Sequence, residues 1–346
     1  METTIFRLTG DPKDDRDMLA QAAAMIKRGD TVAFPTETVY GLGANALDGK
    51  AVKKIFEAKG RPSWNPLIVH VSSREMLNEL VTAYPSGFEE LAAKFMPGPL
   101  TFLLPKSDKI PQEVSAGKES VAVRMHNHTN ALKLIEMAGV PIAAPSANRS
   151  GRTSPTSAEH VIDDLNGLIS AVVDGGSCEV GLESTVLDLS QDPPMILRPG
   201  GVSKEQIESV LKKEVKIFKS SAEGAEGEGL PSPGMTSRHY APLAKLYTTG
   251  ENLPLVLREL DKQLALKMKV GVLLPTNWIL PPKYSGNTNI VVYDYGEWAD
   301  WATMAQRVFH GLRWLDKQGV DVILGPLPPE KGLGLALRDR LLRASK

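Results

Sequence analysis

The sequence predicts an α/β fold with a mixed sheet and a second, smaller α/β unit. Short segments rich in β-branched residues alternate with amphipathic segments whose apolar residues repeat at helical spacing. Neighbouring strands near residues 185 and 196 have connections short enough for antiparallel pairing, so a mixed sheet is favoured over a purely parallel one. A small, acidic stretch over 220–229 lacks bulky apolar residues and predicts a linker between two domains.

The first part of the chain supplies most of the predicted elements. We expect a helix over 18–26 that stops at Gly29, a second helix around 52–56 that ends near Gly60, and a third over 130–138. Strands are expected at 31–34, 66–71, 100–104, 120–125, 140–143, 169–173, 185–189 and 195–198.

The part after the acidic stretch repeats this alternation on a smaller scale. Its expected strands are 243–247, 271–274, 290–292 and 322–324, with helices near 251–266, 298–318 and 332–344. The predicted organisation is therefore a first domain over 1–218, a linker over 219–242 that covers the active site, and a small α/β domain over 243–346.

Composition excludes several classes of protein. The 346 residues are 42% hydrophobic and 23% charged, which is ordinary for globular domains. A formal net charge of -1 disfavours wholesale coating of nucleic acid, and a single cysteine excludes an intramolecular disulfide. We read no signal peptide in the N-terminal sequence, and the apolar runs are too short to span a bilayer, so a cytoplasmic protein without a membrane partner is expected.

The usual nucleotide and hydrolase signatures do not occur. There is no GxxxxGK[ST] loop, complete GxGxxG, HExxH or GxSxG. His126 and His128 bracket one residue without an evident further ligand, so we interpret them as loop histidines and predict no protein metal site.

Two segments in the first domain contain residues suited to ligand binding. Residues 34–43 follow a strand and combine hydroxyls, an acid and glycines, although a simple turn would use the same residues. Lys59 and Arg61 flank Gly60 just before a strand, an arrangement that suits a polyphosphate. Lys59 alone is also explained as a cation at a helix C-terminus, whereas Arg61 is not.

Two strand residues have competing interpretations. Arg124 shares a face with Ser120, opposite Val121 and Val123, so it faces either a pocket, where it would hold a carboxylate, or solvent. His70 lies within an apolar strand, where a histidine is more often a hydrogen-bonded core residue than a functional one. Further polar segments follow at 143–156, 181–186, 197–200 and 232–242.

Together and in this order, these segments resemble the threonylcarbamoyl-AMP synthase family in its longer, two-domain form. The matching motifs are PTETVYGLG (35–43), KGRP (59–62), NPL (65–67), VAVR (121–124), APSAN (144–148), EST (183–185), LRPG (197–200), PGM (233–235) and HYAP (239–242). The resemblance implies a twisted, YrdC-like sheet with a concave basic cleft and a Rossmann-like C-terminal domain. It also implies a nucleotidyltransferase that makes threonylcarbamoyl-AMP and pyrophosphate from L-threonine, bicarbonate or CO2, and ATP. The product would feed the t6A modification of tRNA, with tRNA and the downstream transferase proteins as indirect partners.

The resemblance also implies roles for individual residues. The threonine pocket would be lined by Thr38, His70, Arg124, the Ala144 backbone and Ser184. ATP would contact Arg61, Asn65, Ser120, Ser146, Ser154, Arg198 and Tyr240. Lys59 belongs to the same basic motif as Arg61 and would reach a phosphate, so both count as candidate catalytic residues. Ser120 stands where the family also has threonine, which keeps a hydroxyl.

The residues themselves agree with this chemistry. Lys59 and Arg61 suit a polyphosphate accompanied by Mg²⁺, which bridges phosphate oxygens and needs few protein ligands. No general base or nucleophile is evident, which favours catalysis by positioning and charge neutralisation. Two alternatives stay open: an RNA-binding module that uses the concave basic surface, and a related carbamoyl-adenylate enzyme with another substrate.

Overall fold

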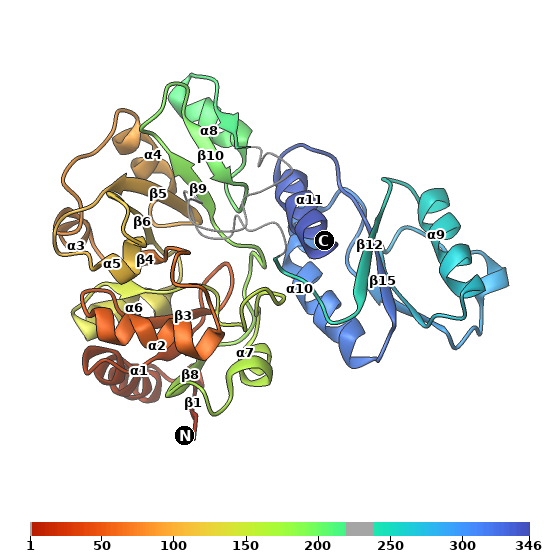
Figure 1. The fold of residues 1–346 in the computed structure, drawn as a ribbon, viewed down its shortest axis with the longest axis horizontal. Helices are drawn as coiled ribbons and strands as arrows, with labels where there is room; N and C mark the ends of the chain where they lie inside the picture. Colours follow the sequence, from red (N-terminus) through yellow and green to blue (C-terminus); the bar gives the residue numbers. More distant parts are fainter. Residues whose placement is uncertain (1, 219–238) are drawn as a thin grey trace. The chain divides into compact units, whose positions relative to one another are not determined.

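The computed structural model describes residues 2–218 and 239–346, which form two compact α/β units (Figure 1). The first unit contains the described residues within Met1–Ser150, Ser154–Glu179 and Glu183–Thr236. The second contains Gly151–Thr153, Val180–Leu182 and the described residues within Ser237–Lys346. Two short segments that the sequence analysis assigned to the first domain thus belong to the second unit. Most of the predicted linker, 219–238, lies outside the described residues.

One large mixed sheet organises the described part of the first unit. Its eleven strands are ordered β1-β8-β2-β3-β7-β4-β6-β5-β9-β10-β11. They comprise β1 (Thr4–Arg7), β2 (Val32–Phe34), β3 (Gly41–Asn45), β4 (Ile68–Val71), β5 (Leu100–Pro105), β6 (Ser120–Met125), β7 (Ile142–Ala143), β8 (Ala171–Asp174), β9 (Thr185–Asp188), β10 (Met195–Arg198) and β11 (Lys216–Ile217). Strands β4 and β6 pair in parallel, whereas β9 and β10 pair antiparallel. The predicted mixed α/β sheet is confirmed.

Helices follow most strands of this sheet. They are α1 (Pro12–Lys27), α2 (Gly49–Lys59), α3 (Arg74–Asn78), α4 (Phe88–Phe95), α5 (Gln112–Ser115), α6 (Thr129–Ala138), α7 (Ala158–Leu165) and α8 (Lys204–Leu211). Asp48 caps the N-terminus of helix α2, because its side chain accepts a hydrogen bond from the Lys50 backbone N–H, and Gly60 caps the C-terminus. Gly60 adopts a φ of 62°, a left-handed conformation that glycine reaches without a Cβ clash. This sharp stop turns the chain between Lys59 and Arg61.

Alternating side chains divide the core between the two faces of the sheet. In β2, Val32 and Phe34 join an apolar cluster with α1 and α6, whereas Ala33 joins a second cluster with α2. Strand β8 divides in the same way, with Val172 on the α2 side. Helices therefore cover both faces, and each face has its own core.

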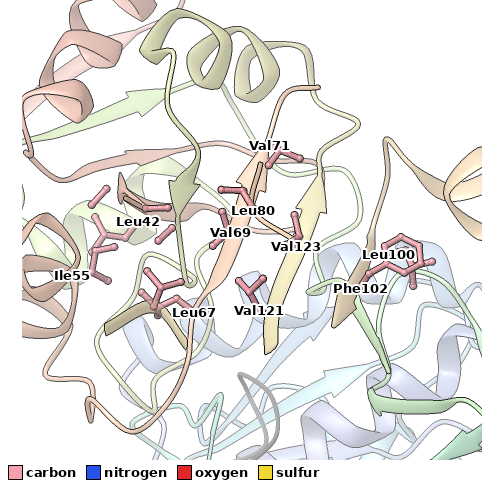
Figure 2. Close-up of a cluster of buried hydrophobic side chains, with 14 of the residues drawn as sticks. Leu42, Ile55, Leu67, Val69, Val71, Leu80, Leu100, Phe102, Val121 and Val123 are labelled. Carbon is pink, nitrogen blue, oxygen red and sulfur yellow. The ribbon is translucent and has the colours of Figure 1, made fainter. Parts of the chain in front are cut away.

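The core on the α2 side is the larger one. Figure 2 shows Val69 from β4 and Val121 and Val123 from β6 in this cluster. Burying each such side chain contributes about 1.5–3 kcal/mol. Because strand side chains alternate, the residues between these valines point to the opposite face of the sheet.

The second unit has a parallel sheet with the strand order β12-β15-β13-β14. Its elements are β12 (Lys245–Thr249), α9 (Leu253–Ala265), β13 (Val270–Leu274), the 3₁₀ helix η1 (Pro282–Tyr284), β14 (Ile290–Asp294), α10 (Trp301–Lys317), β15 (Val322–Pro326) and α11 (Leu333–Ala344). The central strands β13 and β15 are buried throughout, as expected for a parallel sheet covered on both faces. The predicted smaller C-terminal α/β domain is thus present.

One sequence interpretation needs correction. We expected 34–43 to be a loop after a strand, but Gly41–Asn45 forms β3, which pairs antiparallel with β2. Two glycines hid this strand, because glycine is depleted in strands on propensity grounds. Here Gly43 is required, since a Cβ at this position would lie 2.7 Å from Ile142 Cγ2.

Candidate functional site

The centre of the candidate site is a pair of residues on two adjacent strands. His70 on β4 and Arg124 on β6 are register partners in a parallel pair, and the valines beside them, Val69 and Val71 on β4 and Val123 on β6, face the larger core. Register partners share a face of the sheet, so His70 and Arg124 both point away from that core. Both are nonetheless buried, with Arg124 only 3% exposed. The alternative that Arg124 faces solvent is therefore wrong.

Two hydrogen-bond acceptors and one ion-pair partner contact the Arg124 guanidinium. Its Nε donates to the Gly98 carbonyl at 3.1 Å and its Nη1 to Thr38 Oγ1 at 2.9 Å, while its Nη2 lies 2.7 Å from Glu37 Oε1. Thr38 was expected beside Arg124, and the structure places the two in contact. Glu37 was not expected there.

Two histidines stack against each other beside this cluster. The rings of His70 and His126 are 4.4 Å apart at 15°. His126 Nδ1 lies 3.1 Å from Glu37 Oε2, and His70 Nε2 lies 3.0 Å from the Ala144 carbonyl. Since both partners are acceptors, the protons are placed on these two nitrogens. His70 Nδ1 is then a buried lone pair, with no hydrogen-bond partner among the described residues.

Burial controls the charges in this cluster. Desolvation lowers the pKa of His126 to about 4, helped by the positive charge of Arg124 and opposed by Glu37. Burial also lowers the pKa of His70, as do the neighbouring His126 and Arg124. Burial alone would raise the pKa of Glu37, but Arg124, His126 and the Asn127 backbone N–H outweigh it and hold that pKa well below its usual range. At neutral pH the cluster therefore contains the Arg124 cation, the Glu37 anion and the neutral imidazoles of His70 and His126.

The segment 144–148 connects this cluster to the predicted phosphate-binding lysine. Its backbone pairs with the start of β3, through a bridge between Gly41 and Ser146. Lys59 Nζ donates to the Ser146 carbonyl at 2.6 Å and also to the Asn148 carbonyl. Lys59 thus reaches beyond its own helix C-terminus, which the helix-dipole interpretation does not explain.

Arg61 and Asn65 lie together in the turn that follows α2. Arg61 Nη2 donates to the Pro66 carbonyl at 2.9 Å, and its Nε donates to the Asn65 carbonyl at 3.3 Å. Asn65 Oδ1 is buried and has no hydrogen-bond partner within the described part of the chain. A buried acceptor of this kind is suited to a donor from a ligand.

A third group of predicted residues surrounds the entry to β9. Ser184 Oγ lies 2.7 Å from Thr101 Oγ1 and 3.1 Å from Arg198 Nη2, which also donates to the Ser184 carbonyl. Gly200 permits this packing, since a Cβ there would lie 2.3 Å from the Glu183 carbonyl oxygen. Ser154 donates to Glu183 Oε1, so Ser154 is tied to the residue before Ser184.

Ser120 and Tyr240 complete the set of predicted site residues. Ser120 is half-buried at the start of β6, on the Arg124 face. Tyr240 belongs to the second unit, where its ring stacks on Phe309 at 5.6 Å and the Arg340 guanidinium lies 4.9 Å from its centroid. A contact of either residue with ATP stays a prediction.

Sequence reasoning missed Glu37, His126 and Asn148 as parts of the site. His126 does lie in a loop, directly after β6, but it is buried between Glu37 and His70. A signal was present in each case, because Glu37 and Asn148 lie in motifs that carry the family resemblance and His126 lies two residues after one. What the sequence did not show was that strand pairing brings residues 37 and 126 together.

No group of three or more His, Cys, Asp or Glu side chains among the described residues is arranged to hold a metal ion. No helix of 2–218 or 239–346 has both the length and the apolarity needed to cross a membrane.

Family models cover nearly the whole chain. The model Sua5_yciO_yrdC, described as telomere recombination, matches residues 24–200. A second model, the C-terminal domain of threonylcarbamoyl-AMP synthase, matches residues 202–346. These matches define the two-domain class in which a YrdC-like domain precedes a smaller C-terminal domain.

Curated relatives and a solved structure agree over the full length. The threonylcarbamoyl-AMP synthase of Pyrococcus abyssi is 47% identical, covering 94% of this chain and 93% of its own. That of Bacillus subtilis is 44% identical, covering 97% and 94%. The crystal structure of P. abyssi Sua5 complexed with L-threonine matches with a TM-score of 0.89 and 44% identity, covering 100% of this chain and 98% of that one. The chain belongs to the threonylcarbamoyl-AMP synthase family.

Proposed function

We propose that the protein is a threonylcarbamoyl-AMP synthase, which makes threonylcarbamoyl-AMP and pyrophosphate from L-threonine, bicarbonate or CO2, and ATP. The observation that carries this proposal is the similarity of the whole chain, both domains included, to relatives of that name. The site geometry supports it, because Arg124 and His70 lie on one face of the sheet. There the guanidinium can bind an anion and the neutral imidazole can accept a hydrogen bond.

The threonine subsite would be built around Arg124. Its guanidinium still has terminal N–H groups to offer and suits the substrate carboxylate, with Thr38 beside it. The lone pair on His70 Nδ1 suits a donor on threonine, such as its amine or hydroxyl. The Ala144 backbone and Ser184 would complete this subsite.

The ATP subsite would use the groups around Lys59 and Arg61. Arg61, Ser146, Ser154 and Arg198 would contact the nucleotide, and the free acceptor on Asn65 would take a hydrogen bond from it. Ser120 and Tyr240 are proposed contacts on family grounds, and Lys59 would reach a phosphate. Mg²⁺ would arrive with ATP, bound mainly by phosphate oxygens and water.

In this arrangement the chain acts by positioning its substrates. The threonine amine adds to CO2 to give a carbamate, and a carbamate oxygen attacks the α-phosphorus of ATP as pyrophosphate leaves. The basic groups stabilise charge on the phosphates, and bringing the two substrates together supplies much of the acceleration. The product is a labile mixed anhydride, so it would pass to a transferase that acts on tRNA for t6A formation.

The test is pyrophosphate release by the purified full chain. We expect release that needs threonine, bicarbonate and ATP together, with threonylcarbamoyl-AMP as a detectable product. Arg61→Ala should abolish it, whereas Lys109→Ala, which alters an exposed lysine paired with Glu79, should not. Release that is indifferent to threonine, or that accepts other amino acids equally, would refute the proposal.

A further inference from the structure

Glu37 is a buried acid beside Arg124, and the proposed chemistry gives it no task. Each of its oxygens is already engaged: Oε1 lies 2.7 Å from Arg124 Nη2 and accepts from the Asn127 N–H at 2.9 Å, and Oε2 lies 3.1 Å from His126 Nδ1. The Glu37 and Arg124 side chains are 5% and 4% exposed. A buried carboxylate held this firmly has no oxygen free to act as a base.

The same contacts fix the direction of Arg124. A guanidinium has five N–H bonds in one plane. Hydrogen-bond acceptors from two segments of the chain occupy Nε and Nη1, and the Glu37 carboxylate forms an ion pair at Nη2. The plane is therefore defined before any ligand binds. Nη1 and Nη2 each carry two N–H bonds. The described residues supply one hydrogen-bond acceptor to Nη1 and none to Nη2, although Glu37 Oε1 lies 2.7 Å from Nη2.

The contacts also fix the charge. Arg124 and Glu37 cancel one another, and His126 is neutral at physiological pH. An anion that binds Arg124 therefore contacts directed N–H groups, but the Arg124–Glu37 pair that carries them has no net positive charge. A carboxylate carries one negative charge, whereas a phosphate carries up to two near neutral pH. In a buried site, the second charge has no compensation and is disfavoured.

We propose that Glu37 and His126 are positioning residues that orient Arg124 and neutralise its charge, so that this subsite selects a carboxylate over phosphate-like anions. The inference rests on the proposed function, in which a carboxylate substrate and a polyphosphate occupy one site. Such a site needs two anion subsites with different preferences, because the product pyrophosphate and ATP would otherwise compete for the place of the amino acid.

His126 acts through Glu37 in this scheme. Its Nδ1–H holds Oε2, while its ring is held between the stacked ring of His70 and an edge contact with Phe34 at 6.1 Å. Without this donor, the Glu37 carboxylate loses the bond that fixes its second oxygen. Loss of His126 should therefore loosen Arg124 while the charge of Glu37 stays in place.

The test compares the dissociation constants for L-threonine and inorganic phosphate, by calorimetric titration of the full chain without ATP. Glu37→Gln keeps the size of the side chain and removes its charge, and Glu37→Asp keeps the charge. Glu113→Gln is the matched control, since it removes an ion-paired carboxylate that contacts Lys53 instead. Wild type and Glu113→Gln should both prefer threonine strongly over phosphate.

In Glu37→Gln, we expect the preference for threonine over phosphate to fall about tenfold or more, because an uncompensated buried cation favours the more highly charged anion. Glu37→Asp should retain most of the preference. A folded Glu37→Gln whose preference stays within twofold of the wild type overturns the proposal, as does an equal loss in Glu37→Asp.

A second pair of variants keeps the test decisive if Glu37→Gln does not fold. His126→Ala should weaken threonine binding about tenfold without changing the dissociation constant for ATP. His126→Asn, which restores a short donor toward Glu37, should recover part of that loss. Unchanged threonine binding in His126→Ala overturns the proposal. These titrations need no turnover, so a chain that binds threonine but releases no pyrophosphate would refute the proposed function and leave this inference standing.

Discussion

Arg124 and Glu37 form an ion pair of 2.7 Å between β6 and the segment before β3, with both side chains at most 5% exposed. Buried pairs of this kind seldom add net stability, since desolvation offsets the attraction. Here the pair stands next to the predicted threonine-binding residues Thr38 and His70. We therefore infer that the pair sets the geometry and charge of the ligand site and contributes little to stability.

Replacing Arg124 with lysine should damage threonine binding selectively. Lysine keeps the charge but lacks the planar fork that reaches Gly98, Thr38 and Glu37 together. We expect kcat/KM for threonine to fall about 100-fold, or ~2.7 kcal/mol, with little change in the KM for ATP. Steady-state kinetics with each substrate varied in turn checks this, and equal effects on both substrates would contradict it.

Replacing Lys59 should affect the nucleotide side of the reaction. Its ammonium ties the carbonyls of Ser146 and Asn148, so Lys59→Met removes both a charge and the order of that segment. A loss of at least about 100-fold in kcat/KM for ATP is expected, since phosphate-binding cations act mainly on the transition state. Lys53→Met, on the exposed side of the same helix, serves as the control. Comparable activity in the two variants would remove Lys59 from the site.

Stability should fall between pH 6.5 and pH 4. The pKa of His126 is about 4 in the fold, because burial and the charge of Arg124 disfavour its protonation. In this window the unfolded chain binds more protons than the folded chain, so the free energy of unfolding decreases as the pH falls. A shift of this size corresponds to roughly 3 kcal/mol, and His70, whose pKa is also lowered, acts in the same direction.

Urea unfolding at several pH values tests this dependence. His126→Asn removes the titrating ring, so its stability should decline less steeply from pH 6.5 to 4 than that of the wild type. Below about pH 4.5, Glu37 takes up a proton in the unfolded chain while its lowered pKa keeps it ionised in the fold. The free energy of unfolding therefore decreases further. Parallel curves for wild type and His126→Asn would show that His126 is not neutral and buried in solution.

The core behind the site should be sensitive to truncation. Phe102 is fully buried in the larger cluster and has an edge contact with Phe88 at 4.8 Å. Phe102→Ala should lower the free energy of unfolding by about 3–5 kcal/mol. Denaturant titration measures this free energy. A decrease below about 1 kcal/mol would show that Phe102 is not packed in the core as described.

Most of the framework was predictable from the sequence. Strand periodicity gave β6 and β10 with the bounds that the structure has, and the alternation of Val121 and Val123 correctly placed Arg124 on the opposite face. These segments are apolar and short, so local pattern and tertiary burial agree. The glycine-rich β3 and the edge strand β1 were missed, because pairing partners far along the sequence stabilise them.

The site was predictable as a set of residues but not as a set of contacts. Family motifs indicated Thr38, His70 and Arg124, and the structure joins them. The link from Glu37 to His126 spans 89 positions in the sequence and depends on how β3, β4 and β6 are arranged in the sheet. No local pattern contains that information.

The most direct measurement of the central claim is a titration of the full chain with L-threonine and with L-threoninamide, which lacks the carboxylate. If the face of the sheet that carries His70 and Arg124 binds the amino acid through its carboxylate, threonine should bind and the amide should bind at least about tenfold more weakly. The difference should disappear in Arg124→Gln. Equal binding of the two compounds by the wild type, or undiminished threonine binding by Arg124→Gln, would contradict the account.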